Sequence, residues 1–186
     1  RIPRWIQRGE VVNKSEITQL LAECGEILEI SGASPFRVRA FQQGSRALEN
    51  WQGDLDQLVE EDQVTSIRGI GKGLSSIIRD LATSGVSEEE AEIRALVPES
   101  LLELLRIPGL GPKKVRAIHQ ELGILTIAEL EAACFQQQIR ELAGFAERTE
   151  NVILKGIKNL RRFAGRSLLS VSGLVATRFL QSLQRC

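Results

Sequence analysis

The chain has few aromatic residues and no tyrosine, and this shortage bears first on its fold. Aromatic residues make up 4% of its 186 residues, and runs of alternating β-branched residues, the signature of strands, are missing. Methionine is also absent, so we expect either a fragment or a sequence whose start is left out. The formal net charge is +0, which excludes a uniformly basic surface. The composition therefore predicts an all-α protein whose binding of any polyanion is local.

Long apolar runs are missing as well. No run approaches the roughly 18 residues of a membrane span, and the opening RIPRWIQRGE lacks the apolar stretch of a secretory signal. We therefore expect a cytoplasmic protein with no membrane partner. Cys24, Cys134 and Cys186 are odd in number and far apart, which predicts neither a disulfide framework nor a metal cluster. We expect Cys24 and Cys134 to be small buried residues.

Charge is segregated along the chain. Residues 148–185 carry many Lys and Arg with one acid, Glu150, whereas residues 49–62 carry acids and no base. The basic run LKGIKNLRRFAGR (154–166) either follows a DNA backbone or is an exposed helix face.

Helix signals occur throughout the sequence. Asn13 and Glu16 form a predicted capping box before apolar residues at helical spacing, and Ser34 followed by Pro35 predicts a second helix start. The apolar residues of the first helix are Ile17, Leu20, Leu21, Cys24, Ile27 and Leu28. Further helices are predicted at 54–61, 72–84, 88–96, 98–106, 112–122, 126–137, 149–163 and 166–184.

A repeat joins several of these helices. SIRGIGKGLSSIIRDL (66–81) aligns with LRIPGLGPKKVRAIHQEL (105–122), and ELAGFAERTENVILKGI (141–157) is a weaker third copy with Ala146 in place of the second glycine. The spacing of about 35 to 40 residues makes each copy one supersecondary unit. We predict an extension (1–12), a first domain (13–86), a second domain with a degenerate third hairpin (87–165) and a carboxy-terminal helix (166–186).

The two strong copies have the chemistry of an anion site. In each, two glycines flank one apolar residue, as in Gly69-Ile70-Gly71 and Gly109-Leu110-Gly111, and a helix begins immediately afterwards. Unpaired N–H groups and the positive end of the helix dipole would then face outward together and bind a phosphate without reading a base. The basic residues flanking the turns are Arg68, Lys72, Arg106, Lys113 and Lys114. The alternative, a turn that merely joins two helices, is disfavoured by the repetition.

These residues resemble a known family. The stretch NKSEITQLLAECGEILEISGASPFRVRAFQQGSRALE and its GIG turn resemble the small amino-terminal domain of bacterial family X DNA polymerases, which are DNA polymerase beta-like. IPGLGPKKV, LGILTIAELEAA and the GF turn resemble the region that follows in the same enzymes. The resemblance covers residues 13–186 and implies tandem helix-hairpin-helix domains.

The resemblance also implies roles for individual residues. Gly69, Gly71 and Lys72 would contact the 5′ side of a gapped DNA, whereas the primer strand would meet Gly109, Gly111, Lys113 and Lys114. Arg37 and Arg39 would meet a 5′-phosphate, unless they form a solvated helix face. Backbone carbonyls would hold a monovalent cation, Na⁺ or K⁺, at Thr65, Ile67 and Ile70 and at Leu105, Ile107 and Leu110.

The catalytic parts of the family do not match. Relatives that remove a 5′-deoxyribose phosphate use a lysine where this chain has Ile77, with Gly73 and Phe41 at two accompanying positions. Polymerisation needs three carboxylates on a sheet that hold Mg²⁺, and a phosphoesterase needs several histidines, whereas His119 is the one histidine here. We therefore expect no enzyme activity and no required cofactor. The chain would be part of a longer polymerase, with Mg²⁺ bound elsewhere, or a free-standing relative.

Three functions stay open at this point. The first is sequence-nonspecific binding of gapped, nicked or 5′-phosphorylated DNA in repair, alongside other repair proteins. The second is a protein-interaction scaffold with vestigial hairpins, which the neutral net charge and the degenerate third hairpin favour. The third is a 5′-deoxyribose phosphate lyase with a relocated lysine.

Overall fold

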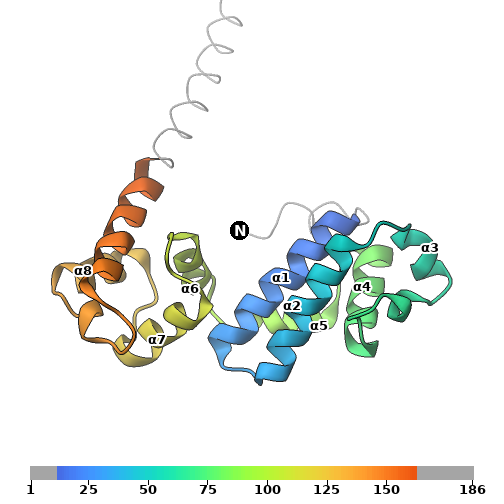
Figure 1. The fold of residues 1–186 in the computed structure, drawn as a ribbon, viewed down its shortest axis with the longest axis horizontal. Coiled ribbons are helices and arrows are strands. Elements are labelled where there is room, and N and C mark those ends of the chain that lie inside the picture. Colours follow the sequence, from blue (N-terminus) through green and yellow to red (C-terminus); the bar gives the residue numbers. More distant parts are fainter. Residues whose placement is uncertain (1–11, 163–186) are drawn as a thin grey trace, which may run out of the picture. The chain divides into compact units, whose positions relative to one another are not determined.

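The computed structural model describes residues 12–162, which form helices joined by short loops (Figure 1). This part of the chain contains no strand, which confirms the all-α prediction. It divides into two compact units, with the boundary between Glu99 and Ser100. The predicted extension, apart from residue 12, and the predicted helix at 166–184 lie outside the described residues. No helix within residues 12–162 is long and apolar enough to cross a membrane.

The first unit is built on two long helices, α1 (Lys14–Ser31) and α2 (Pro35–Asn50), which lie side by side (Figure 1). The predicted capping box between Asn13 and Glu16 is present, and the Ser34 side chain accepts the N–H of Arg37 at the start of α2. The apolar residues predicted for the first helix, Cys24 included, are all buried. Local caps and helical periodicity therefore specify this pair.

The rest of the first unit comprises α3 (Leu55–Glu60), the 3₁₀ turn η1 (Val64–Ser66), α4 (Lys72–Ser84) and α5 (Glu88–Ala95). Helices α4 and α5 pack on α1, whereas α3 and η1 pack on α4. Helix α4 buries Ile77, Ile78 and Leu81. Helix α5 is held to α1 by Arg94, whose Nη2 lies 2.8 Å from Glu23 Oε2. Because α5 packs here, the first unit extends to Glu99, beyond the boundary at residue 86 that the repeat predicts.

The second unit comprises α6 (Glu99–Glu103), which begins at the boundary, the 3₁₀ turn η2 (Leu104–Arg106), α7 (Pro112–Leu122), α8 (Ile127–Phe135), the 3₁₀ turn η3 (Ile139–Glu141) and a helix at 147–162. We call this last element the final helix. The single helix predicted at 98–106 is thus a short α-helix that tightens into a 3₁₀ turn. Residues from each element form the core, including Leu104, Ile107, Val115, Ile118, Leu130, Ile153 and Ile157.

Candidate functional site

Hairpin 1, defined as η1, the turn at 67–71 and the start of α4, is fixed by a ladder of backbone hydrogen bonds. The N–H of Ile67 donates to Val64 O (3.2 Å), and the N–H of Ile70 donates to Ile67 O (3.0 Å). Gly69 has a φ of 104°, which is closed to most other residues. Ile67 and Ile70 are buried, so the apolar residue between the glycines anchors the turn as the sequence predicts.

Hairpin 2, defined as η2, the turn at 107–111 and the start of α7, repeats this geometry in the second unit. The N–H of Ile107 donates to Leu104 O and that of Leu110 to Ile107 O, both at 3.1 Å. Gly109 has a φ of 88°. The alignment of the two segments therefore reflects one backbone conformation formed twice.

The second glycine of each hairpin differs from the first, because its own backbone does not require glycine. Gly71 and Gly111 are the N-caps of α4 and α7, with extended backbone angles of φ −88°, ψ 175° and φ −90°, ψ 171°. A Cβ added at either position would meet nothing within 4 Å. Neither conformation nor internal packing explains these two glycines, and the absence of a Cβ leaves room for a ligand to approach the backbone.

The helix starts at these glycines also lack the caps found elsewhere. Side chains of Asn13, Ser34, Asp54, Ser87 and Thr126 accept backbone N–H groups at the starts of α1, α2, α3, α5 and α8. Helices α4 and α7 have no side-chain cap hydrogen bond. Pro112 has no N–H and the N–H of Lys114 donates to Gly111 O (3.0 Å), so Lys113 is the residue of the first turn of α7 whose N–H can meet a ligand. Such N–H groups, together with the positive end of the helix dipole, are suited to an anion.

Basic side chains surround both sites, but they do not all point to them. Arg68 and Lys72 at hairpin 1 and Arg106 and Lys113 at hairpin 2 are exposed. Lys114, by contrast, is half-buried. Its Nζ donates to Gly109 O (3.1 Å) and lies 5.8 Å from the centre of the Phe145 ring. Lys114 thus supports the turn of hairpin 2, and Lys113 is the lysine of the predicted pair that faces solvent.

The third copy has the same fold and a different chemistry. Gly144 has a φ of 81°, the N–H of Phe145 donates to Leu142 O (3.0 Å), and Ala146 occupies the N-cap position. The buried Glu150 carboxylate pairs with Arg140 (Nη2 to Oε1, 2.6 Å) and accepts the backbone N–H of Arg140 (3.3 Å).

The ion pair between Arg140 and Glu150 satisfies the polar groups of the third turn within the chain. The hydrogen bond with Glu150 raises the pKa of Arg140 and keeps the guanidinium charged. An acid, Glu147, stands directly after the N-cap, where α4 has Lys72. A carboxylate at this helix start disfavours a second anion. The third hairpin is therefore a structural turn of the second unit.

Arg37 and Arg39 lie in the first turns of α2. Arg37 pairs with Glu89 (Nη2 to Oε1, 3.1 Å), while Arg39 donates to Pro35 O (3.1 Å) and stacks 5.1 Å from the centre of the Phe36 ring. Hairpin 1 meets α2 near Ala47, whose Cβ would lie 3.4 Å from a Cβ on Gly69. Arg37 is ten residues, about 15 Å of helix, before this contact.

Hairpin 1 also meets α2 near Gln43, whose O would lie 3.9 Å from a Cβ on Gly69. The structure therefore holds Arg37 in its pair with Glu89 away from this contact, whereas Arg39 lies one helical turn before Gln43.

The positions of the lyase machinery are apolar here. Ile77 is 1% exposed, within the face of α4 that packs into the core, and Phe41 is also buried. Gly73 is exposed on the first turn of α4. Since Ile77 carries no amine and is sealed from solvent, this position cannot form a Schiff base.

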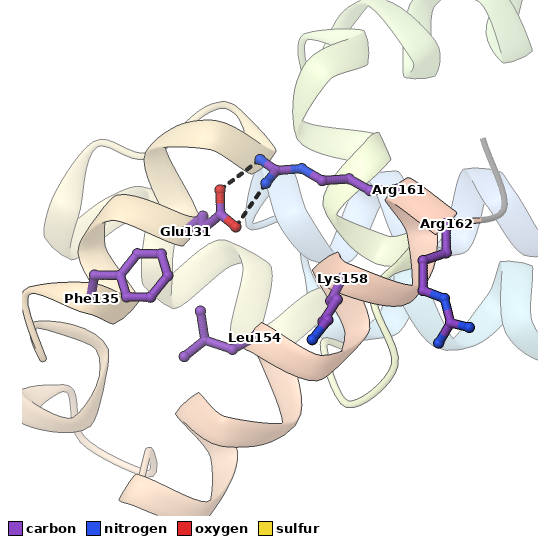
Figure 2. Close-up of a pocket in the computed structure, with 6 residues that line it drawn as sticks. All are labelled: Glu131, Phe135, Leu154, Lys158, Arg161 and Arg162. Carbon is purple, nitrogen blue, oxygen red and sulfur yellow. Dashed lines mark hydrogen bonds and ion pairs between the residues drawn. The ribbon is translucent and has the colours of Figure 1, made fainter. Parts of the chain in front are cut away.

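A pocket of about 430 Å³ opens elsewhere in the second unit, between α8 and the final helix (Figure 2). Phe135 and Leu154 give it an apolar lining, and Arg161 pairs with Glu131 through two hydrogen bonds of 2.9 and 2.6 Å. Lys158 and Arg162 complete the lining. Among residues 12–162, no group of three or more His, Cys, Asp or Glu is arranged to hold a metal ion.

Comparisons with known proteins agree with this geometry. A helix-hairpin-helix domain family matches residues 12–87, and a SAM-like helix-hairpin-helix tandem family matches residues 101–159. The DNA polymerase/3'-5' exonuclease PolX of Bacillus subtilis (strain 168) is 38% identical over 146 residues, which is 78% of this chain and 25% of that protein. The chain spans about a quarter of the length of this curated relative. The chain therefore carries two helix-hairpin-helix domains and is homologous to the amino-terminal quarter of a bacterial family X DNA polymerase.

Proposed function

We propose that the chain binds DNA through its sugar-phosphate backbone, without reading sequence, and that hairpins 1 and 2 each hold one phosphate. One observation carries the proposal. Helices α4 and α7 begin at glycines that neither backbone angle nor packing requires, and both starts lack a side-chain cap. Backbone N–H donors at such a start favour a phosphate and carry no base specificity.

The flanking charges and the homologue support the same proposal. Arg68, Lys72, Arg106 and Lys113 are exposed beside the two turns, where they would neutralise neighbouring phosphates. The homologous region belongs to a protein whose name is that of a DNA polymerase and exonuclease. Two phosphate sites in one chain suit gapped, nicked or 5′-phosphorylated DNA, on which strand ends lie close together, and hence a role in repair.

We also propose that the turn carbonyls bind a monovalent cation, Na⁺ or K⁺, next to the phosphate. Ile67 O and Ile107 O each accept one turn N–H and keep a second lone pair. With the carbonyls of Thr65 and Ile70, or of Leu105 and Leu110, they supply neutral oxygen ligands within a few residues. Replacing K⁺ with Li⁺ at constant ionic strength should weaken DNA binding, because Li⁺ is too small for this set of carbonyl oxygens.

The experiment that tests the function is fluorescence anisotropy with labelled one-nucleotide-gapped, nicked, blunt and single-stranded DNA, each with and without a 5′-phosphate. Wild type is compared with Gly71→Val, Gly111→Val and the matched control Ala146→Val in the third hairpin. All three side chains enter exposed turn positions, and circular dichroism checks that each variant is folded.

We expect gapped, 5′-phosphorylated DNA to bind best. Each glycine variant should lose about tenfold or more, the value of one hydrogen-bonded phosphate, and Ala146→Val should bind like wild type. Equal binding by all four proteins would exclude the hairpins as phosphate sites. Failure of the wild type to bind any of these DNAs would exclude the function.

A further inference from the structure

The final helix exposes a strongly basic face. Its buried side carries Glu150, Ile153, Gly156 and Ile157. Its exposed side, which we call the basic face, carries Arg148, Asn151, Lys155, Lys158, Asn159 and Arg162. Apart from Glu147 in the first turn of the helix, the basic face carries Lys, Arg and Asn side chains and no Asp or Glu. That concentration stands out in a chain whose formal net charge is +0.

The basic face is not neutralised by the second unit. Arg161 of the final helix pairs with Glu131 through two hydrogen bonds, while Figure 2 shows Lys158 and Arg162 pointing away from that pair. Within residues 12–162, neither Lys155 nor Lys158 forms an ion pair or a hydrogen bond. Like charges three and four residues apart destabilise an isolated helix, so an external anion would relieve a repulsion that is built into the face.

The basic face lies directly beside hairpin 2. A Cβ on Gly109 would come within 2.9 Å of Val152 Cγ1, and Val152 borders the basic face. A Cβ on Gly156 would come within 2.8 Å of Ile107 Cγ2 and 3.0 Å of Pro108 Cδ. The turn that would hold a phosphate therefore packs on the middle of the same helix, next to Lys155.

The length of the face fits several phosphates. Fourteen residues separate Arg148 from Arg162, which is about 21 Å along a helix. This length spans several phosphates of a DNA strand, whose rise along the duplex axis is about 3.4 Å per phosphate and whose path winds around that axis. A phosphate held at Gly111 would be the first of a short series.

We propose that the basic face is a second DNA contact, along which the strand held by hairpin 2 continues, with Arg148, Lys155, Lys158 and Arg162 facing its phosphates. The inference rests on the proposed function. It adds a surface that the hairpins do not include, and it commits to a nucleic-acid backbone because the face combines cations and amides over a length of several phosphates.

The test is the salt dependence of binding to gapped DNA, measured by anisotropy from low to moderate KCl. The variant is Lys155→Gln with Lys158→Gln. The matched control is Gln52→Glu with Gln120→Glu, which changes the net charge by the same amount at two exposed positions outside the basic face. Gly111→Val reports separately on hairpin 2.

We expect the lysine variant to lower the slope of log affinity against log salt by about two, since each released phosphate contact contributes about 0.9, and the control to keep the wild-type slope. A lysine variant with the slope of the control, while Gly111→Val still loses binding, would overturn this inference and leave the proposed function standing; the face would then be free for an acidic protein. Absence of wild-type binding would overturn both.

Discussion

Replacing Gly111 with serine should make the protein more stable and weaken its DNA binding. Gly111 is the N-cap of α7, has a φ of −90°, and leaves open space for a side chain. A serine hydroxyl there would accept an N–H of the first turn, as Ser34 and Ser87 do in α2 and α5. The hydroxyl would thus occupy a donor that we assign to the phosphate.

The expected change in stability and the expected change in DNA affinity can be estimated separately. The gain in cap strength over glycine is a few tenths of a kcal/mol, and the reduced freedom of the unfolded chain adds about 0.4–1 kcal/mol. A total of about 1 kcal/mol raises the Tm of a unit of this size by roughly 4–8 °C. Loss of one hydrogen bond to a charged phosphate costs about 1.5–3 kcal/mol, a ten- to hundredfold weaker Kd.

Thermal unfolding by circular dichroism and anisotropy with gapped DNA measure the two effects. The matched control is Ala146→Ser, which adds the same cap to the third hairpin and should raise Tm without changing Kd. A Gly111→Ser protein that is more stable and binds DNA as tightly as wild type would refute the reasoning, because the N–H groups at this helix start would then not be the phosphate donors.

Three further predictions concern stability and reactivity. Gly156→Ala should destabilise the second unit by about 1–3 kcal/mol through its clash with Ile107, whereas Gly73→Ala, in open space, should stabilise the first by up to about 1 kcal/mol; urea unfolding measures both. Burial raises the pKa of the Cys24 thiol to about 12, so a thiol reagent at pH 8 should leave it unmodified until the protein unfolds. Hydrogen bonds, chiefly from the N–H of Leu125, lower the pKa of Glu129 below 4.5 in the folded protein. The stabilisation that ionised Glu129 contributes is therefore complete above pH 4.5 and lost as the pH falls through the pKa of the folded state. Glu129→Gln should flatten the dependence of Tm on pH in this acidic range.

Much of the fold follows from local signals in the sequence. The predicted helices at 72–84 and 112–122 begin and end where α4 and α7 do, because a glycine cap precedes each and a left-handed glycine, Gly85 or Gly123, closes it. Hairpins 1 and 2 could also be predicted from the sequence, because each turn requires a glycine at one position with a positive φ, Gly69 or Gly109.

What the sequence did not show depends on contacts between distant residues. The ion pair of Arg94 with Glu23 assigns α5 to the first unit, and these residues are far apart in sequence. Lys113 and Lys114 are adjacent, but a helix turns about 100° per residue, so one faces solvent and the other returns to Gly109 O. Gly156 within a helical pattern was a usable signal of close packing, although it does not say which segment approaches.

The central claim is that backbone N–H groups at the starts of α4 and α7 hold phosphates, and the most direct test is to observe those groups. In ¹⁵N-labelled protein titrated with gapped, 5′-phosphorylated DNA, the amide resonances of Lys72, Gly73 and Lys113 should shift strongly at saturation, while that of Glu16, whose N–H already donates to Asn13 Oδ1, should shift little. DNA binding that leaves the amides of both glycine-capped starts unchanged would contradict the account.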